Sequence, residues 1–213
     1  MNTPTKVKLQ EVLLSEVYFK FNYYSPPGTD VFDEDNENTH QDIVSGNIMY
    51  FDCEAFDEDG IEDYSIGTFK AKILYGGEDK IYRCLEYDGS ITDVRYQDEL
   101  FVVKDDIYGG RYVHVRECYY DLMSEVYENR FMILDKVELN DLYRGHGVLK
   151  KLIQFISKTF NVPILIKPYP LQYEGEGMDN DIQFKLDLKK VENAYRKCGF
   201  KKGRPKSEYM IKW

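Results

Sequence analysis

The sequence has few of the residues that build metal sites, disulfide frameworks or membrane spans. Its three histidines and four cysteines include no Cys-x-x-Cys pair, so the ligand spacing of a zinc site is missing and we expect no metal. The cysteines are widely spaced in 213 residues, which is typical of reduced core thiols. No apolar run approaches the roughly 18 residues of a spanning helix. Residues 1–8 are polar, unlike a signal peptide. We therefore expect a cytoplasmic protein that contacts no membrane.

Basic residues are also fewer than acidic ones. The chain has 28 Lys and Arg but 38 Asp and Glu, which gives a net charge of -10. This balance argues against a nucleic-acid partner, because phosphate contacts need clustered Lys and Arg. Hydrophobic residues make up 43% of the chain, enough for a substantial core. No linker clearly divides the sequence, so we expect one domain over residues 1–213.

Residues 130–167 give the clearest prediction of secondary structure, a strand, a turn, a helix and a second strand. Residues 130–139 (RFMILDKVEL) read as a strand, and a turn over 140–147 follows. Residues 148–160 place apolar side chains at helical spacing and lysines opposite, which predicts an amphipathic helix. The short apolar segment 162–167 (VPILIK) predicts a buried strand that Pro168 ends.

The last third continues with a loop, a helix and a strand. Residues 171–183 read as a Gly- and acid-rich loop, after which Asp187 is expected to cap a helix. Gly199 is a natural residue to end that helix in a left-handed conformation, and Phe200 can make the hydrophobic contact that follows. Residues 207–213 alternate and predict a final strand.

The first half is predicted as strands, acidic loops and one helix. Strands are expected over residues 5–24, 43–53 and 65–75, the last two paired as a hairpin. Acidic loops are expected over 30–42 and 54–63. Ser90 is a candidate cap for a helix that runs to Leu100, while residues 112–129 are ambiguous between strand and helix.

The turn Arg144-Gly145-His146-Gly147 leads straight into the helix at Val148. Two glycines let the backbone approach a ligand, and the helix N-terminus supplies unpaired N–H groups and a positive dipole end. Together they form an anion site suited to a pyrophosphate. No Gly-Lys-Ser/Thr follows, and the Gly-x-Gly-x-x-Gly fingerprint is absent, so Walker and dinucleotide-binding loops are disfavoured.

Two motifs in this order resemble the GNAT acyltransferase superfamily over residues 130–213. The run from Arg144 to Leu149 is similar to that family's Arg/Gln-x-x-Gly-x-Gly/Ala pattern, with Leu149 where the family prefers Gly or Ala. The run Tyr195-Arg196-Lys197-Cys198-Gly199-Phe200 is similar to its Tyr-x-x-x-Gly-Phe ending. The Asn-x-x-Ala pattern often seen before that Tyr is missing.

The resemblance implies an α/β (α+β) fold: a GNAT-like mixed, mostly antiparallel twisted sheet flanked by helices. Residues 130–213 would form the acyl-CoA-binding portion and residues 1–129 a divergent N-terminal portion. The strands at 130–139 and 162–167 would splay apart to hold acetyl-CoA. The implied cofactor-binding residues are Val137, Glu138, Leu139, Arg144, Gly145, His146, Gly147, Val148 and Leu149, the first three through their backbone. Tyr195 would be the acid that protonates the leaving CoA thiolate.

Each of these residues also has a structural interpretation. The two glycines can simply form a tight strand-to-helix connection, and Arg144 can be a surface residue. His146 is expected to face solvent. Tyr195 lies on the apolar stripe of its helix, so it is either an acid or plain core.

Other titratable residues have weaker signals. Glu138, Glu174 and Glu176 are candidate bases, although solvated carboxylates are the commoner case. Cys198 is expected to be a small core residue.

The expected function is N-acetyl transfer from acetyl-CoA to a primary amine. The acidic stretches at 30–42 and 54–63 favour a cationic acceptor, because opposite charge raises the encounter rate. The alternative is a non-catalytic GNAT-scaffold protein, in which residues 1–129 form a protein interface.

Overall fold

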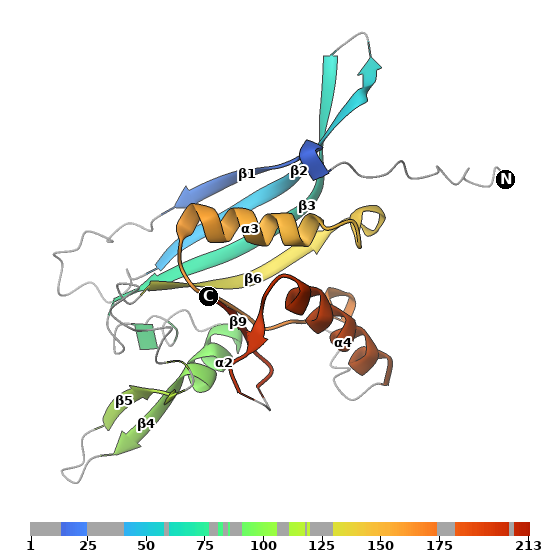
Figure 1. The fold of residues 1–213 in the computed structure, drawn as a ribbon. Helices are drawn as coiled ribbons and strands as arrows, with labels where there is room; N and C mark the ends of the chain where they lie inside the picture. The colour runs from blue at the N-terminus through green and yellow to red at the C-terminus, as the bar shows by residue number, and fades with distance from the viewer. Residues whose placement is uncertain are drawn as a thin grey trace.

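One seven-stranded sheet organises the chain (Figure 1). The computed structural model describes residues 14–24, 41–57, 60–76, 81–82, 85, 91–105, 111–117, 119, 130–173, 182–204 and 207–213. Within them the strand order is β1-β2-β3-β6-β7-β9-β8, and β4 and β5 form a separate pair. The strands of the large sheet are β1 (Val17–Tyr24), β2 (Gln41–Asp57), β3 (Gly60–Tyr75), β6 (Arg130–Leu139), β7 (Ile164–Ile166), β8 (Lys201–Lys202) and β9 (Met210–Lys212). The small pair consists of β4 (Phe101–Asp105) and β5 (Arg111–Val115).

Every neighbouring pair in the large sheet is antiparallel except β6 with β7, which is parallel. The predicted mixed, mostly antiparallel sheet is therefore confirmed. The β3–β6 ladder runs from Gly67 opposite Leu139 to Tyr75 opposite Arg130. Strands from both the 1–129 and the 130–213 portions thus belong to the same sheet.

Successive residues of the central strands point to opposite faces of the sheet, and each face has its own core. In β6, Met132 and Leu134 pack on one face, while Phe131 and Ile133 pack on the other. The first face is covered by α3 (Val148–Phe160) and α4 (Ile182–Lys197), and the second by α2 (Ile91–Leu100) with β4 and β5 (Figure 1). This two-sided burial explains the nearly continuous apolar runs of β6 and β7.

The helix α3 has the bounds that its periodicity predicts. Gly147 precedes it with φ 84°, and Asn161 ends it with φ 50°. Its buried face consists of Val148, Leu152, Ile153 and Ile156.

The predicted start of α4 is wrong. The helix begins at Ile182, so Asp187 lies in its second turn and does not cap it. Its predicted end is confirmed: Gly199 has φ 96°, its N–H donates to Arg196 O at 3.0 Å, and the N–H of Phe200 donates to Tyr195 O at 3.2 Å. These two bonds are those of a Schellman motif.

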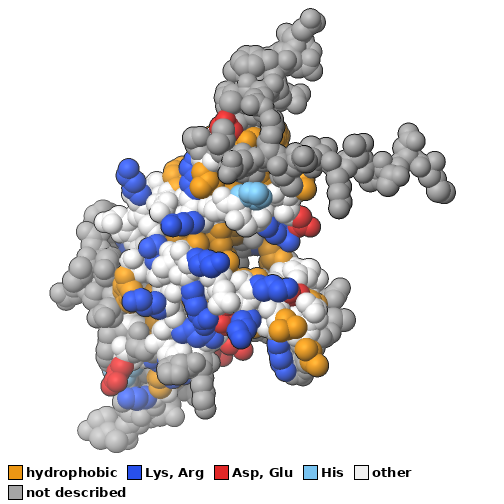
Figure 2. Space-filling view, turned by 45° about the vertical axis from the view of Figure 1, so that its right-hand side comes forward, with side chains coloured by type: hydrophobic (Ala, Val, Ile, Leu, Met, Phe, Trp, Pro, Cys, Tyr) orange, Lys and Arg blue, Asp and Glu red, His pale blue; other side chains and the backbone are white. Residues whose placement is uncertain are grey.

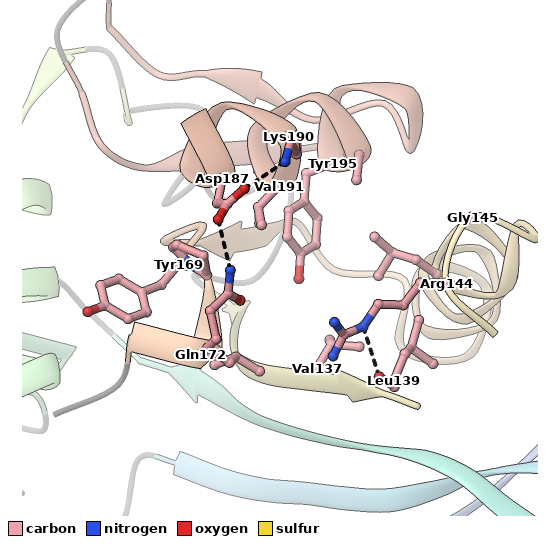
Figure 3. Close-up of a pocket in the computed structure, with 14 residues that line it drawn as sticks. Val137, Leu139, Arg144, Gly145, Tyr169, Gln172, Asp187, Lys190, Val191 and Tyr195 are labelled. Atoms are coloured by element: carbon pink, nitrogen blue, oxygen red, sulfur yellow. Dashed lines mark hydrogen bonds and ion pairs between the residues drawn. The ribbon is translucent and has the colours of Figure 1, made fainter. Parts of the chain in front are cut away.

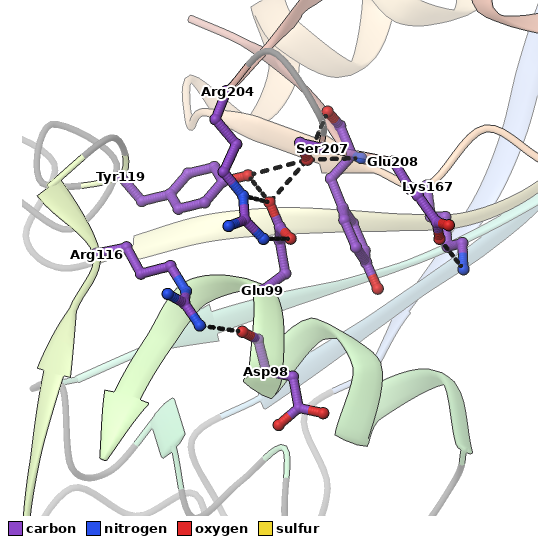
Figure 4. Close-up of polar contacts among 9 residues, drawn as sticks. Asp98, Glu99, Arg116, Tyr119, Lys167, Arg204, Ser207 and Glu208 are labelled. Atoms are coloured by element: carbon purple, nitrogen blue, oxygen red, sulfur yellow. Dashed lines mark hydrogen bonds and ion pairs between the residues drawn. The ribbon is translucent and has the colours of Figure 1, made fainter. Parts of the chain in front are cut away.

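A buried polar cluster fixes α2 to the C-terminal segment (Figure 4). Glu99 of α2 is 5% exposed and accepts hydrogen bonds from Tyr119, Arg204 and Ser207. Each carboxylate oxygen therefore has a donor, which offsets the cost of burying the charge.

The predictions for the first half are correct in part. The helix expected before Leu100 is α2, although Ser90 lies outside the described residues. The acidic loop predicted over 54–63 is wrong for residues 54–57 and 60–63, which extend β2 and β3. Of residues 5–24 the structure describes only 14–24, and of the loop predicted over 30–42 only Gln41 and Asp42, which lie in β2. The ambiguous segment 112–129 contains most of β5.

Candidate functional site: a cavity beside the open edge of β6

The strand β6 separates from β7 soon after the two pair. Their register joins only Met132 with Ile164 and Ile133 with Leu165. Along the opposite edge, Lys70 pairs with Lys136 and Ala71 with Leu134, so Asp135 is an extra residue in β6. Such a bulge bends a strand and increases its twist. Beyond Asp135, the edge of β6 on the β7 side is therefore not covered by β7.

A cavity of about 660 Å³ lies along this open edge, between β6, the turn before α3, and α4 (Figure 3). Its size is that of a site for a small molecule or cofactor. The lining comprises Val137, Leu139, Arg144, Gly145, Leu149, Tyr169, Pro170, Leu171, Gln172, Asp187, Lys190, Val191, Ala194 and Tyr195.

Six of the ten predicted site residues line this cavity and four do not. The six are Val137, Leu139, Arg144, Gly145, Leu149 and Tyr195, and the four are Glu138, His146, Gly147 and Val148. Glu138 points away because side chains alternate along a strand: its carboxylate pairs with Lys136 at 2.7 Å and accepts from Thr68 at 3.2 Å. Val148 is buried in the core, and His146 is exposed.

The backbone of β6 offers polar groups to the cavity at alternate residues. A Cβ built on Gly67 of β3 would lie 2.2 Å from the carbonyl oxygen of Glu138, so this carbonyl faces β3. Antiparallel strands alternate the side to which backbone groups point. The N–H and C=O groups of Val137 and Leu139 therefore face the cavity. Of the three residues predicted to bind the cofactor through their backbone, these two face the cavity and Glu138 does not.

The turn before α3 presents backbone N–H groups. Gly145 and Gly147 have φ 89° and 84°, a region that other residues rarely adopt. The first helical hydrogen bond runs from Lys151 N to Gly147 O at 3.1 Å. No side chain caps α3 at Gly147, and among the described residues the N–H groups of Val148, Leu149 and Lys150 have no acceptor. An anion can bind these N–H groups.

Arg144 lies at the edge of the cavity with a partly neutralised charge. Its Nη1 is 2.6 Å from Asp141 Oδ1, and its Nε donates to Leu139 O at 3.0 Å. The side chain is 61% exposed. Arg144 is therefore held next to the end of β6 and is still accessible to a ligand.

Tyr195 is both a core residue and a cavity residue. Its ring is 6% exposed and meets Phe200 edge-on, with centroids 5.4 Å apart. Figure 3 shows its hydroxyl pointing from α4 toward β6. This hydroxyl makes no hydrogen bond to any described residue. Burial, and then the Cys198 thiol, raise the pKa of Tyr195 well above its usual value, so the hydroxyl stays protonated at neutral pH.

Sequence reasoning missed the polar wall that α4 provides. Asp187 accepts hydrogen bonds from Gln172 at 3.2 Å, Tyr173 at 3.0 Å, Gln183 at 3.1 Å and Lys190 at 2.7 Å. Lys190, then Gln183 and Tyr173, lower the pKa of Asp187 to about 2, so it is ionised at neutral pH. The spacing i, i+3, i+4, i+7 of Asp187, Lys190, Val191 and Ala194 was the available signal for a shared helix face.

The charges of the chain are divided between its two portions. Residues 130–213 hold 17 Lys and Arg but 10 Asp and Glu, whereas residues 1–129 hold 11 and 28. Figure 2 shows Lys and Arg side chains around a hollow lined by hydrophobic ones. Although the net charge of the whole chain is -10, residues 130–213 carry more basic than acidic side chains, which suits an anionic ligand.

Comparisons with protein-family models, with curated proteins and with solved structures gave no significant match. The sheet is also broader than that of a typical GNAT protein. The GNAT resemblance stays a prediction based on two motifs.

The described residues contain no group of three or more His, Cys, Asp or Glu placed to hold a metal ion. None of their helices is long and apolar enough to cross a membrane.

Proposed function

We propose that this protein is an N-acetyltransferase of the GNAT type, which transfers an acetyl group from acetyl-CoA to a primary amine. The observation that carries the proposal is the cavity along the open edge of β6, which ends at the glycine turn before α3. An elongated thioester fits this arrangement, with its anionic end at the turn and its arm along the strand.

Each part of the site matches one part of acetyl-CoA. The N–H groups at the start of α3, which have no acceptor among the described residues, and the adjacent Arg144 suit the pyrophosphate. The backbone groups of Val137 and Leu139 suit the amides of the pantetheine arm, and the apolar side chains of Leu149, Val191 and Ala194 suit its methylene groups.

The proposed chemistry is direct transfer. The neutral amine nitrogen attacks the thioester carbonyl, a C–N bond forms, and the C–S bond breaks. The departing thiolate takes a proton from the Tyr195 hydroxyl, and the extra proton that the nitrogen loses passes through solvent water and restores that hydroxyl. Tyr195 is placed for this role because its hydroxyl is protonated at neutral pH, points toward β6 and makes no hydrogen bond to any described residue.

Isothermal titration with acetyl-CoA tests the site. We expect saturable binding by the wild type and its loss in Ala194→Phe, whose ring would fill the cavity from α4. Asn193→Phe is the matched control, because residue 193 is exposed on the same helix and does not line the cavity. If the wild type binds acetyl-CoA, a panel of amines that includes cationic ones should be screened for acetyl transfer. Absence of binding by the wild type would contradict the proposal.

One observation favours the alternative, a binding module without catalysis. The Tyr195–Phe200 contact belongs to the Schellman motif that ends α4, so the Tyr-x-x-x-Gly-Phe pattern has a structural reason to exist without an acid. Tight binding of acetyl-CoA without transfer to any amine of a broad panel would support this alternative.

A further inference from the structure

Gln172, in η5 (Leu171–Tyr173), has one end of its carboxamide bonded to Asp187 of α4. Its Nε2 donates to Asp187 Oδ2 at 3.2 Å, across from α4. An ionised carboxylate only accepts hydrogen bonds, so the NH₂ group of Gln172 must face Asp187. The low pKa of Asp187, about 2, keeps that carboxylate ionised at neutral pH. The orientation of the carboxamide therefore follows from its partner.

The other end of this carboxamide is directed into the cavity. Figure 3 shows the Gln172 oxygen on the side that faces Tyr195, away from Asp187. Among the described residues no group donates to this oxygen. Gln172 lines the cavity, so the site contains an acceptor with a set direction and no donor among the described residues.

Asp187 can orient Gln172 because several hydrogen bonds keep its own side chain in place. Tyr173 also donates to Oδ2, at 3.0 Å, so two side chains of η5 are bound to one residue of α4. Lys190 donates to Oδ1 at 2.7 Å from the next turn. The Asp187 side chain is only 15% exposed, which limits competition from water.

We infer that Gln172 Oε1 accepts a hydrogen bond from an amide N–H of the pantetheine arm, and that Asp187 is the positioning residue that directs it. This inference rests on the proposed function and adds the residue that recognises the arm. The arm would lie between two polar walls: the backbone of Val137 and Leu139 on β6, and Gln172 on η5. Adenine, ribose and the phosphates would make no contact with Gln172.

The test separates the two ends of the ligand. Binding of acetyl-CoA, 4′-phosphopantetheine and adenosine 3′,5′-bisphosphate is measured by titration for the wild type, Gln172→Leu and Asp187→Leu. We expect both variants to bind acetyl-CoA and 4′-phosphopantetheine roughly fivefold more weakly, the effect of one neutral hydrogen bond. Their affinity for the bisphosphate should equal that of the wild type.

Gln183→Leu is the matched control. Gln183 also donates to Asp187 Oδ2, at 3.1 Å, but it does not line the cavity. It should leave all three affinities unchanged, which shows that loss of one Asp187 partner is not enough to weaken binding.

The outcomes separate this inference from the proposed function. A wild type that binds acetyl-CoA, together with a Gln172→Leu variant that binds 4′-phosphopantetheine equally well, overturns the role of Gln172 alone. Equal weakening of the bisphosphate overturns it too, because that result indicates a general loss of structure. A wild type that binds none of the three probes overturns both proposals.

Discussion

The guanidinium of Arg204 forms a two-point contact with the carboxylate of Glu99. Nη2 lies 2.6 Å from Oε2, and Nε lies 3.2 Å from Oε1. The hydroxyls of Tyr119 and Ser207 complete the shell of Oε1 at 2.5 and 2.7 Å. This cluster joins α2, on one face of the sheet, to the segment between β8 and β9. None of its four residues lines the candidate cavity, so it offers a test of the fold that does not depend on function.

Replacing Arg204 by alanine should destabilise the protein more than replacing another arginine of similar exposure. Arg204→Ala leaves a buried carboxylate without its cation, and we expect a loss of about 1–2 kcal/mol, limited because Arg204 is 43% exposed. Arg196 is 47% exposed and pairs with Glu192 within α4, so Arg196→Ala should cost under about 0.5 kcal/mol. Denaturant unfolding measures both, and equal losses would contradict the prediction.

The stabilising effect of Glu99 should depend on pH. Burial raises the pKa of Glu99, but hydrogen bonds from Arg204, Tyr119 and Ser207 outweigh it, so the folded-state pKa lies below the ordinary value of 4.5. A lowered pKa stabilises the fold above the ordinary value, and this stability is lost as pH falls through the lowered one. Glu99→Gln should therefore melt at a lower temperature than the wild type at pH 7, and the gap should narrow below about pH 4. A gap that is constant from pH 7 to pH 3 would count against this assignment.

Local sequence patterns predicted the elements with strong periodicity. The bounds of β6 and α3 follow from an apolar run, a helical stripe and the glycine turn between them. The Schellman end of α4 follows from Gly199 and Phe200. In these places a few neighbouring residues determine the conformation.

Other features depend on contacts between distant residues. The extra residue Asp135 follows the apolar run 131–134 directly, but a charged residue at this point does not indicate how the strand pairs, so the bulge could not be predicted from the sequence. Asp187 resembles a helix cap in sequence, yet its partners Gln172 and Tyr173 come from the segment before α4. The cavity arises where a bulged strand separates from a very short one, and tertiary pairing alone decides that.

Tyr195→Phe should separate catalysis from binding. Phenylalanine keeps the ring contact with Phe200, so stability and acetyl-CoA affinity should stay near wild type. Without the hydroxyl, kcat for an amine substrate should fall by roughly 10²-fold or more. The control is Tyr169→Phe, because Tyr169 also lines the cavity but its hydroxyl donates to Tyr173 O at 3.0 Å. An unchanged kcat in Tyr195→Phe would remove Tyr195 as the acid while leaving the binding site intact.

Arg144 should contribute to acetyl-CoA binding in a salt-dependent way. Its guanidinium lies at the edge of the cavity beside the first N–H groups of α3, where the proposal places the pyrophosphate. Asp141 already neutralises part of the charge, and the side chain is 61% exposed, so we expect only about 1 kcal/mol, or roughly fivefold weaker binding, in Arg144→Ala. The loss should shrink between low salt and roughly 0.5 M salt, because exposed charges are screened. Arg196→Ala removes the same charge from a position that does not line the cavity, and it should bind acetyl-CoA as the wild type does. A similar effect of both variants would mean that the general positive charge of residues 130–213, and not a phosphate contact at the turn, attracts the ligand.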